Sequence, residues 1–152
     1  MKKLLAVALA LCLLVPCAGA EINGKGIEDF FVYASVFGLD DLSLKNAEID
    51  VLNSNGIGKT VIWNIEECRI ILTFDNADNL NGGMISGKGD LFLAACAALI
   101  SGMDETGKYN DYGDFLSCYL LAASDTQRHY GTLSNGIIFY IEKGNTYYTF
   151  MI

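Results

Sequence analysis

The stretch TVIWNIEECRIILTF, residues 60 to 74, indicates the fold class most directly. Thr60 to Ile65 is rich in β-branched residues, and Cys68 to Phe74 alternates apolar with other side chains. Both patterns predict β-strands. The pair Glu66-Glu67 between them is poor turn chemistry. The sequence is therefore compatible either with a turn here or with one long bent strand.

The residues before this stretch predict a helix and another strand. Ile27 to Leu39 has apolar residues at helical spacing, and Ala47 to Leu52 alternates apolar and acidic residues. Asn55-Gly56 then predicts a hairpin turn, because both residues tolerate a positive φ.

The residues after it predict a loop, two helices and a meander. Asp75 to Gly89 reads as a polar, glycine-rich loop that could hold a short strand at Met84 to Ser86. Leu91 to Ser101 is apolar all round, which predicts a central helix covered on most sides, and Asp111 to Ala123 is amphipathic. Three strands are expected at the end of the chain: Thr126 to Leu133, Ile137 to Glu142 and Thr146 to Ile152.

These elements predict an α+β fold in the order α-β-β-β-α-α-β-β-β, with antiparallel sheet packed on helices and the other sheet face wet. Both halves run from a helix into a strand meander. The helix starts Asp29 to Tyr33 and Asp114 to Tyr119 are also alike. A faint internal duplication would explain this likeness, and so would aromatic core spacing alone. The order is analogous to small exported binding and inhibitor domains, an analogy that carries no function.

The first twenty residues predict a secretory signal peptide of bacterial style. Lys2-Lys3 gives a positive start, Leu4 to Val15 is apolar and uncharged, and Ala18 to Ala20 offers the small residues of a cleavage site. Cleavage after Ala20 would leave residues 21–152, the size of a single domain. Leu14 to Cys17 also resembles a lipobox, although Pro16 stands where a small residue is usual. Lipidation of Cys17 would instead tether the protein to the cell envelope.

The charge balance limits the partners. The whole chain carries 10 basic and 18 acidic residues; removal of the two leader lysines leaves 8 against 18, a net charge of −10. Such a surface repels nucleic acid and anionic lipid headgroups. We therefore expect no nucleic-acid partner, no membrane span after signal removal, and an extracellular or cell-envelope protein as the partner.

Three cysteines remain after cleavage, Cys68, Cys96 and Cys118. All lie in apolar surroundings, which favours buried small side chains. A Cys96–Cys118 disulfide between neighbouring helices is the alternative.

Weak candidates for metal binding and catalysis are present. Two acidic segments offer oxygen ligands for calcium, although neither has the spacing of a calcium loop and turns or helix caps explain most of these residues. The candidate ligands are Asp75, Asp78, Asp104, Asp111 and Asp114. His129 is the only histidine and lies in no recognisable catalytic motif. The sequence predicts no cofactor.

Four tyrosines are better candidates for binding. Tyr109 and Tyr112 flank a loop with Asn, Asp and Gly, and Tyr147 and Tyr148 are adjacent. Tyrosine beside such residues is a composition that recognises proteins. We therefore expect a secreted, non-catalytic binding or inhibitor-like domain. The alternatives are a small extracellular hydrolase and an envelope lipoprotein tethered through Cys17.

The intact mass of the native exported protein tests the leader. We expect the mass of residues 21–152, because the leader matches a cleavable signal peptide. The mass of a chain that begins at Cys17 and carries acyl groups would establish the tethered form instead.

Overall fold

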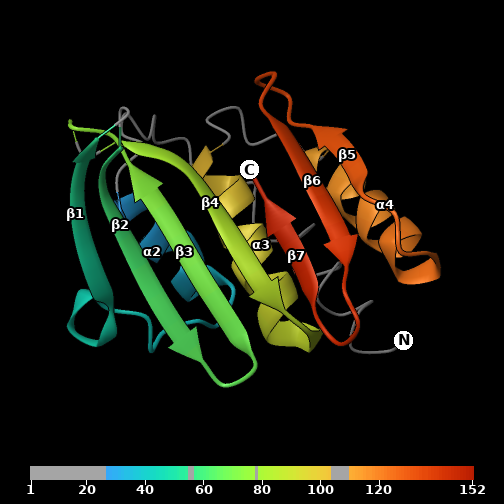
Figure 1. Ribbon diagram of the computed structural model, residues 1–152, viewed down its shortest axis with the longest axis horizontal. Coiled ribbons are helices and arrows are strands. Elements are labelled where there is room, and N and C mark those ends of the chain that lie inside the picture. Colours follow the sequence, from blue (N-terminus) through green and yellow to red (C-terminus); the bar gives the residue numbers. More distant parts are fainter. Residues whose placement is uncertain (1–26, 55–56, 78, 104–109) are drawn as a thin grey trace.

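The computed structural model describes residues 27–54, 57–77, 79–103 and 110–152 (Figure 1). The predicted leader, with Cys17, and the Asn55-Gly56 turn lie outside this part of the chain. The described elements are, in order: α2 Ile27–Val36, η2 Leu44–Asn46 (a 3-10 helix), β1 Glu48–Ser54, β2 Ile57–Ile65, β3 Cys68–Phe74, β4 Leu80–Gly87, α3 Gly89–Met103, α4 Asn110–Ser124, β5 His129–Thr132, β6 Ile138–Lys143 and β7 Tyr148–Met151.

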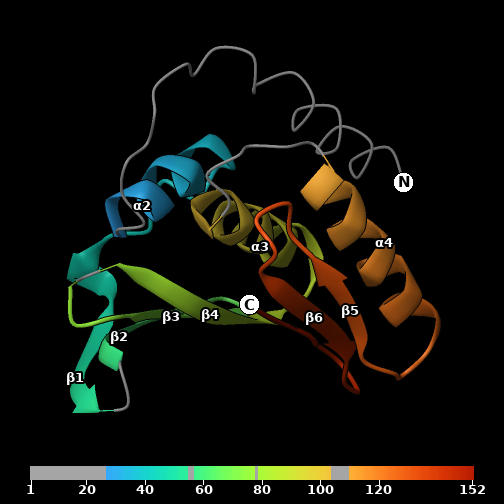
Figure 2. The ribbon, with the colours of Figure 1, turned by 90° about the horizontal axis from the view of Figure 1, so that it is seen from above.

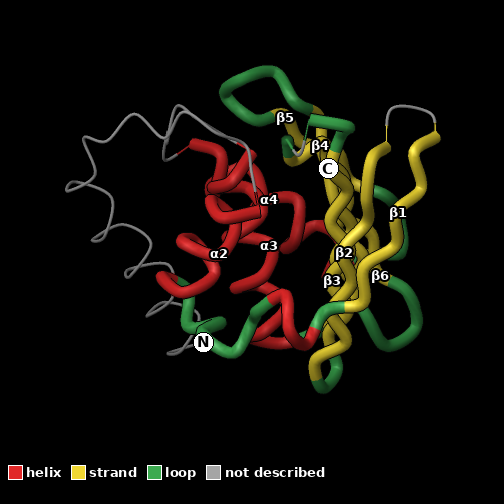
Figure 3. Tube along the Cα trace, turned by 90° about the vertical axis from the view of Figure 1, so that its left-hand side faces the viewer, coloured by secondary structure: helices red, strands yellow, loops and turns green. Residues whose placement is uncertain are grey.

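The strands form one antiparallel sheet in the order β1-β2-β3-β4-β7-β6-β5 (Figure 1). Strands β1 to β4 form one meander and β5 to β7 another, and the two meet where β4 pairs with β7. The helices α2, α3 and α4 lie in one layer on one face of the sheet (Figure 2, Figure 3). The predicted α+β class with antiparallel sheet packed on helices is confirmed.

One strand was missing from the predicted order. The segment Asp75 to Gly89 is not mainly a loop, because the eight residues of β4 lie in it at the centre of the sheet. Its glycines allow close packing: a Cβ at Gly83 would lie 2.7 Å from Cδ2 of Leu99 in α3. A Cβ at Gly82 would lie 2.7 Å from the carbonyl oxygen of Ile152. Glycine in this segment therefore marks close approach within a sheet.

The β2–β3 connection is a tight turn, so one long bent strand is excluded. Ile65 pairs with Cys68 directly across Glu66-Glu67, and Glu66 has a φ of 46°. This left-handed backbone costs a non-glycine residue roughly 1–2 kcal/mol. Cross-strand pairing along the whole of β3 compensates for that cost.

The helix α3 is central, as its uniformly apolar sequence predicts. It packs on β3 and β4 and lies between α2 and α4 (Figure 2). Its buried residues come from all sides of the helix: Phe92, Leu93, Ala95, Cys96, Ala97, Ala98, Leu99, Ile100, Gly102 and Met103. A helix enclosed in this way has no need of a polar face.

The sheet order is compatible with the predicted duplication. Each meander ends where β4 pairs with β7, which we call the seam, and these two last strands run antiparallel. One half carries α2 and the other α4, at opposite sides of the helix layer (Figure 2). The duplication itself stays a prediction.

Replacement of Phe150 by Ala should destabilise the protein by about 3–5 kcal/mol. Phe150 lies in β7, is fully buried, and its ring centroid lies 5.4 Å from that of Phe115 and 5.5 Å from that of Phe139. Urea unfolding followed by circular dichroism measures the change. The control is Ile138→Ala, which removes a side chain that is 65 % exposed and should change stability by less than about 0.5 kcal/mol. Equal effects of the two variants would contradict this assignment of the core.

Candidate functional site

The structure does not bring Tyr112 together with Tyr147 and Tyr148. Tyr109 lies outside the described residues. Tyr112, in the first turn of α4, is half-buried, hydrogen-bonds Ser101 and packs on the Phe37 ring. These contacts give Tyr112 a structural role between α2, α3 and α4.

The other two tyrosines lie at a different end of the sheet. Tyr148 is half-buried against Phe92 and Tyr119, with centroids 5.8 Å and 4.7 Å away. Tyr147 is 42 % exposed and lies under the ammonium of Lys88. Tyr147 lies in the β6–β7 connection, whereas Asp111 at the start of α4 accepts a hydrogen bond from Ser134 in the β5–β6 connection, at the other end of β6. Tyr112 is therefore remote from Tyr147 and Tyr148.

Asp75 organises the loop before β4. Its carboxylate accepts hydrogen bonds from the backbone N–H groups of Ala77 and Asn79 and from the Asn79 side chain, at 2.8–3.0 Å. These bonds, first that from the Asn79 amide, lower the pKa of Asp75 below its ordinary value. The predicted calcium ligand thus acts as the acceptor of an Asx turn.

Asp111 holds the β5–β6 connection. It is 2 % exposed in the first turn of α4, and its Oδ1 accepts hydrogen bonds from the backbone N–H (2.7 Å) and the hydroxyl (2.8 Å) of Ser134. Next to it, the side-chain amide of Asn135 donates to the carbonyl of Met103 at the end of α3, at 2.7 Å. These bonds fasten the connection to the ends of two helices.

Of the remaining calcium candidates, the structure describes only Asp114. Asp114 is exposed on α4, and Asp78 and Asp104 lie outside the described residues. Within residues 27–54, 57–77, 79–103 and 110–152, no group of three or more histidines, cysteines and acids could hold a metal ion.

The three cysteines that the structure describes, Cys68, Cys96 and Cys118, are buried and carry free thiols. The alternative of a Cys96–Cys118 disulfide is therefore not formed in this structure. Burial raises the pKa of Cys68 to about 11 and also raises the pKa values of Cys96 and Cys118. Protonated, enclosed thiols are poor nucleophiles.

His129 is paired with an acid. Its Nε2 lies 2.8 Å from Oδ1 of Asp125, which follows α4, and this bond is the first cause of the lowered pKa of Asp125. A triad histidine is held by its acid at Nδ1 and presents Nε2 to the nucleophile. In this arrangement Nε2 is already occupied, so the pair does not resemble a hydrolytic triad.

The face of the sheet opposite the helices carries a feature that the sequence analysis missed. Residues paired across antiparallel strands project from the same face. The strand register joins six large side chains of this open face into one continuous line, which we call the open-face row: Ile62, Ile71, Met84, Met151, Tyr140 and Tyr130. Their strand neighbours point the other way and form the buried core, for example Trp63, Ile70 and Phe150.

The row is most exposed at its β5 end. Ile62 is 9 % exposed and Tyr130 63 %, and Ile138, on the same face two residues before Tyr140, is 65 % exposed. The rings of Tyr130 and Tyr140 lie 5.9 Å apart. This end therefore presents a patch of aromatic and aliphatic surface to solvent.

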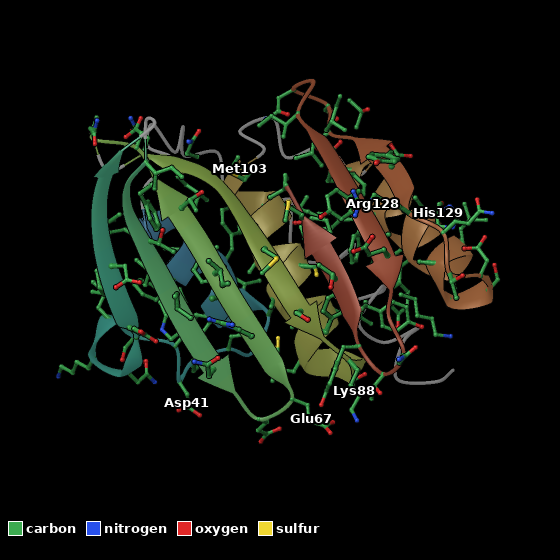
Figure 4. The ribbon with its side chains drawn as sticks, viewed as in Figure 1. Asp41, Glu67, Lys88, Met103, Arg128 and His129 are labelled. Carbon is green, nitrogen blue, oxygen red and sulfur yellow. The ribbon has the colours of Figure 1, made fainter. Side chains whose placement is uncertain are left out.

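Arg128 stiffens this patch. Its guanidinium carbon lies 4.1 Å from the centroid of the Tyr140 ring, and its Nε donates to the Glu142 carboxylate at 2.9 Å. Figure 4 views the sheet from the open face and shows Arg128 beside β6. The same view shows Glu67, just before β3, and Lys88, just after β4, which form an exposed ion pair of 2.7 Å.

Comparison with family models, curated proteins and solved structures found no match to this chain. Among the described residues, no helix has both the length and the apolar character that a bilayer span requires.

Replacement of Asp75 by Ala should lower the melting temperature at neutral pH, whether or not calcium is present. The lowered pKa means that Asp75 contributes stability above its ordinary pKa and loses it as the pH falls through the lowered value. The difference between the two proteins should therefore shrink in acid. Thermal unfolding from pH 7 downwards, with calcium and with chelator, measures this. The control is Asp114→Ala, which removes an exposed acid. A calcium-dependent rise in the melting temperature that requires Asp75 would contradict the turn assignment.

Proposed function

We propose that this chain is a secreted, non-catalytic binding domain that recognises an extracellular or cell-envelope protein through the open face of its sheet. The observation that carries the proposal is the open-face row, in which the strand register aligns six large apolar and aromatic side chains. Tyr, Met and Arg are enriched at protein interfaces relative to other surfaces. Sheet faces of this kind that stay uncovered by helices are otherwise expected to be polar.

The β5 end of the row is suited to carry most of the binding energy. Tyr130, Tyr140 and Ile138 supply exposed apolar area, and Arg128 is held in place by Glu142 before any partner arrives. Side chains that are already ordered lose little conformational entropy on binding. Tyr and Arg are also the residues that most often dominate binding energies.

The alternative of a small hydrolase gains no support from a specific observation. His129 is bonded through Nε2, and the buried thiols have raised pKa values. The tethered form through Cys17 concerns the anchoring of the domain and is compatible with the same binding surface.

Photo-crosslinking in the source cells tests the surface. A benzophenone amino acid in place of Tyr140 should give a covalent adduct with a partner protein, because this ring lies within the proposed interface. The matched control carries the same group at Leu120, which is 60 % exposed on α4 in the opposite layer.

Once the adduct identifies the partner, Tyr130→Ala should weaken binding by about 2 kcal/mol. Adducts at position 120 but not at position 140, or unchanged affinity of Tyr130→Ala and Tyr140→Ala, would contradict the proposal.

A further inference from the structure

The edge strand β1 offers its backbone for pairing. Of the described strands, only β2 pairs with β1. The register with β2 is regular from Glu48 to Val51, and the bulge follows between Val51 and Ser54. An edge strand presents a row of N–H and C=O groups to which another chain can add as a strand. The first half of β1 is therefore regularly paired with β2 on one side and has an unpaired edge on the other within the described structure.

The opposite edge is less suited to accept a strand. There, β5 has only four residues, from His129 to Thr132, and α4 packs against it. The buried Leu133 follows directly and enters the core. Of the two edges, β1 is the longer and the more open.

Side chains on both faces of β1 are available to a partner. Glu48 and Asp50 are exposed and share the open face with their pair residues Ile62 and Thr60. Ile49 projects from the other face and is 46 % exposed, because β1 lies beyond the helix layer (Figure 2). The edge thus presents an acid, an apolar side chain and an acid in succession.

We propose that this edge binds an extended, basic segment of a partner protein as an eighth strand. Opposite charges on directly paired residues favour pairing, and like charges oppose it. The incoming strand would place basic side chains opposite Glu48 and Asp50 and an apolar side chain opposite Ile49. The same acids repel the β1 edge of a second copy, and the net charge of −8 adds to that repulsion. The β1 edge adjoins the Ile62 end of the open-face row, whereas the patch proposed to carry most of the binding energy lies at the β5 end, so each proposal can fail without the other.

Short capped peptides test the edge in the mature protein. The probe is Thr-Lys-Val-Lys-Val-Lys-Thr with a fluorescent label, and its counterpart has Glu in place of each Lys. Fluorescence anisotropy should show binding of the Lys peptide alone. N-methylation of one alternate set of its amides should abolish binding, and methylation of the other set should not, because only one set faces β1.

Charge reversal then locates the site. Asp50→Lys should weaken binding of the Lys peptide roughly fivefold or more, because it replaces an attractive cross-strand pair by a repulsive one. The matched control is Asp114→Lys, which makes the same change of net charge on α4 and should leave the affinity within about twofold.

Three outcomes would overturn the proposal: no binding of the Lys peptide, equal effects of the two methylation patterns, or equal effects of the two lysine variants. Formation of a dimer by the unmodified protein through β1 would also overturn it, in favour of a second copy as the occupant.

Discussion

The pairing of β4 with β7 holds the two meanders together, and the rest of the structure depends on it. The strand β7 joins the two meanders, and the pairing continues past its end, where Ile152 and Gly83 exchange two backbone hydrogen bonds of 3.0 Å. Small residues are required at this seam, since the glycines of β4 let α3 and the end of the chain approach closely. Side chains at these positions would separate the central helix from the sheet and leave voids in the core.

The one-sided helix layer follows from this centre. With α3 over the seam and α2 and α4 beside it, all three described helices bury the same face of the sheet (Figure 2). Strand residues alternate between the two faces, so a full core on one face commits the other set of side chains to the open face. On that face the register aligns the open-face row. The alignment of the row is therefore a consequence of topology. The large size of its side chains is not explained by packing on the helices, because these residues lie on the other face.

The polar residues that looked functional in the sequence are used mainly to fasten connections. Asp75 caps the loop before β4, and Asp111 binds Ser134 between β5 and β6. His129 and Asp125 join the end of α4 to the start of β5. Short polar side chains at turns satisfy backbone groups that would otherwise lose their hydrogen bonds. The two proposed recognition surfaces, the open sheet face and the β1 edge, use none of these residues.

The sequence by itself determined the fold class, the central helix and six of the seven strands that the structure describes, because helical and strand periodicities are local properties of the chain. It did not determine β4, since glycine is common both in loops and where backbones pack closely. At Gly83 the close packing becomes visible only in the structure, where Leu99 of α3 leaves no room for a side chain. Nor did it determine the site. Tyr112 and Tyr147 were both candidates for binding, and only the topology shows that they lie at different ends of β6. Met84 and Met151 are neighbours only because distant strands pair, and that choice of partner is made by the tertiary structure.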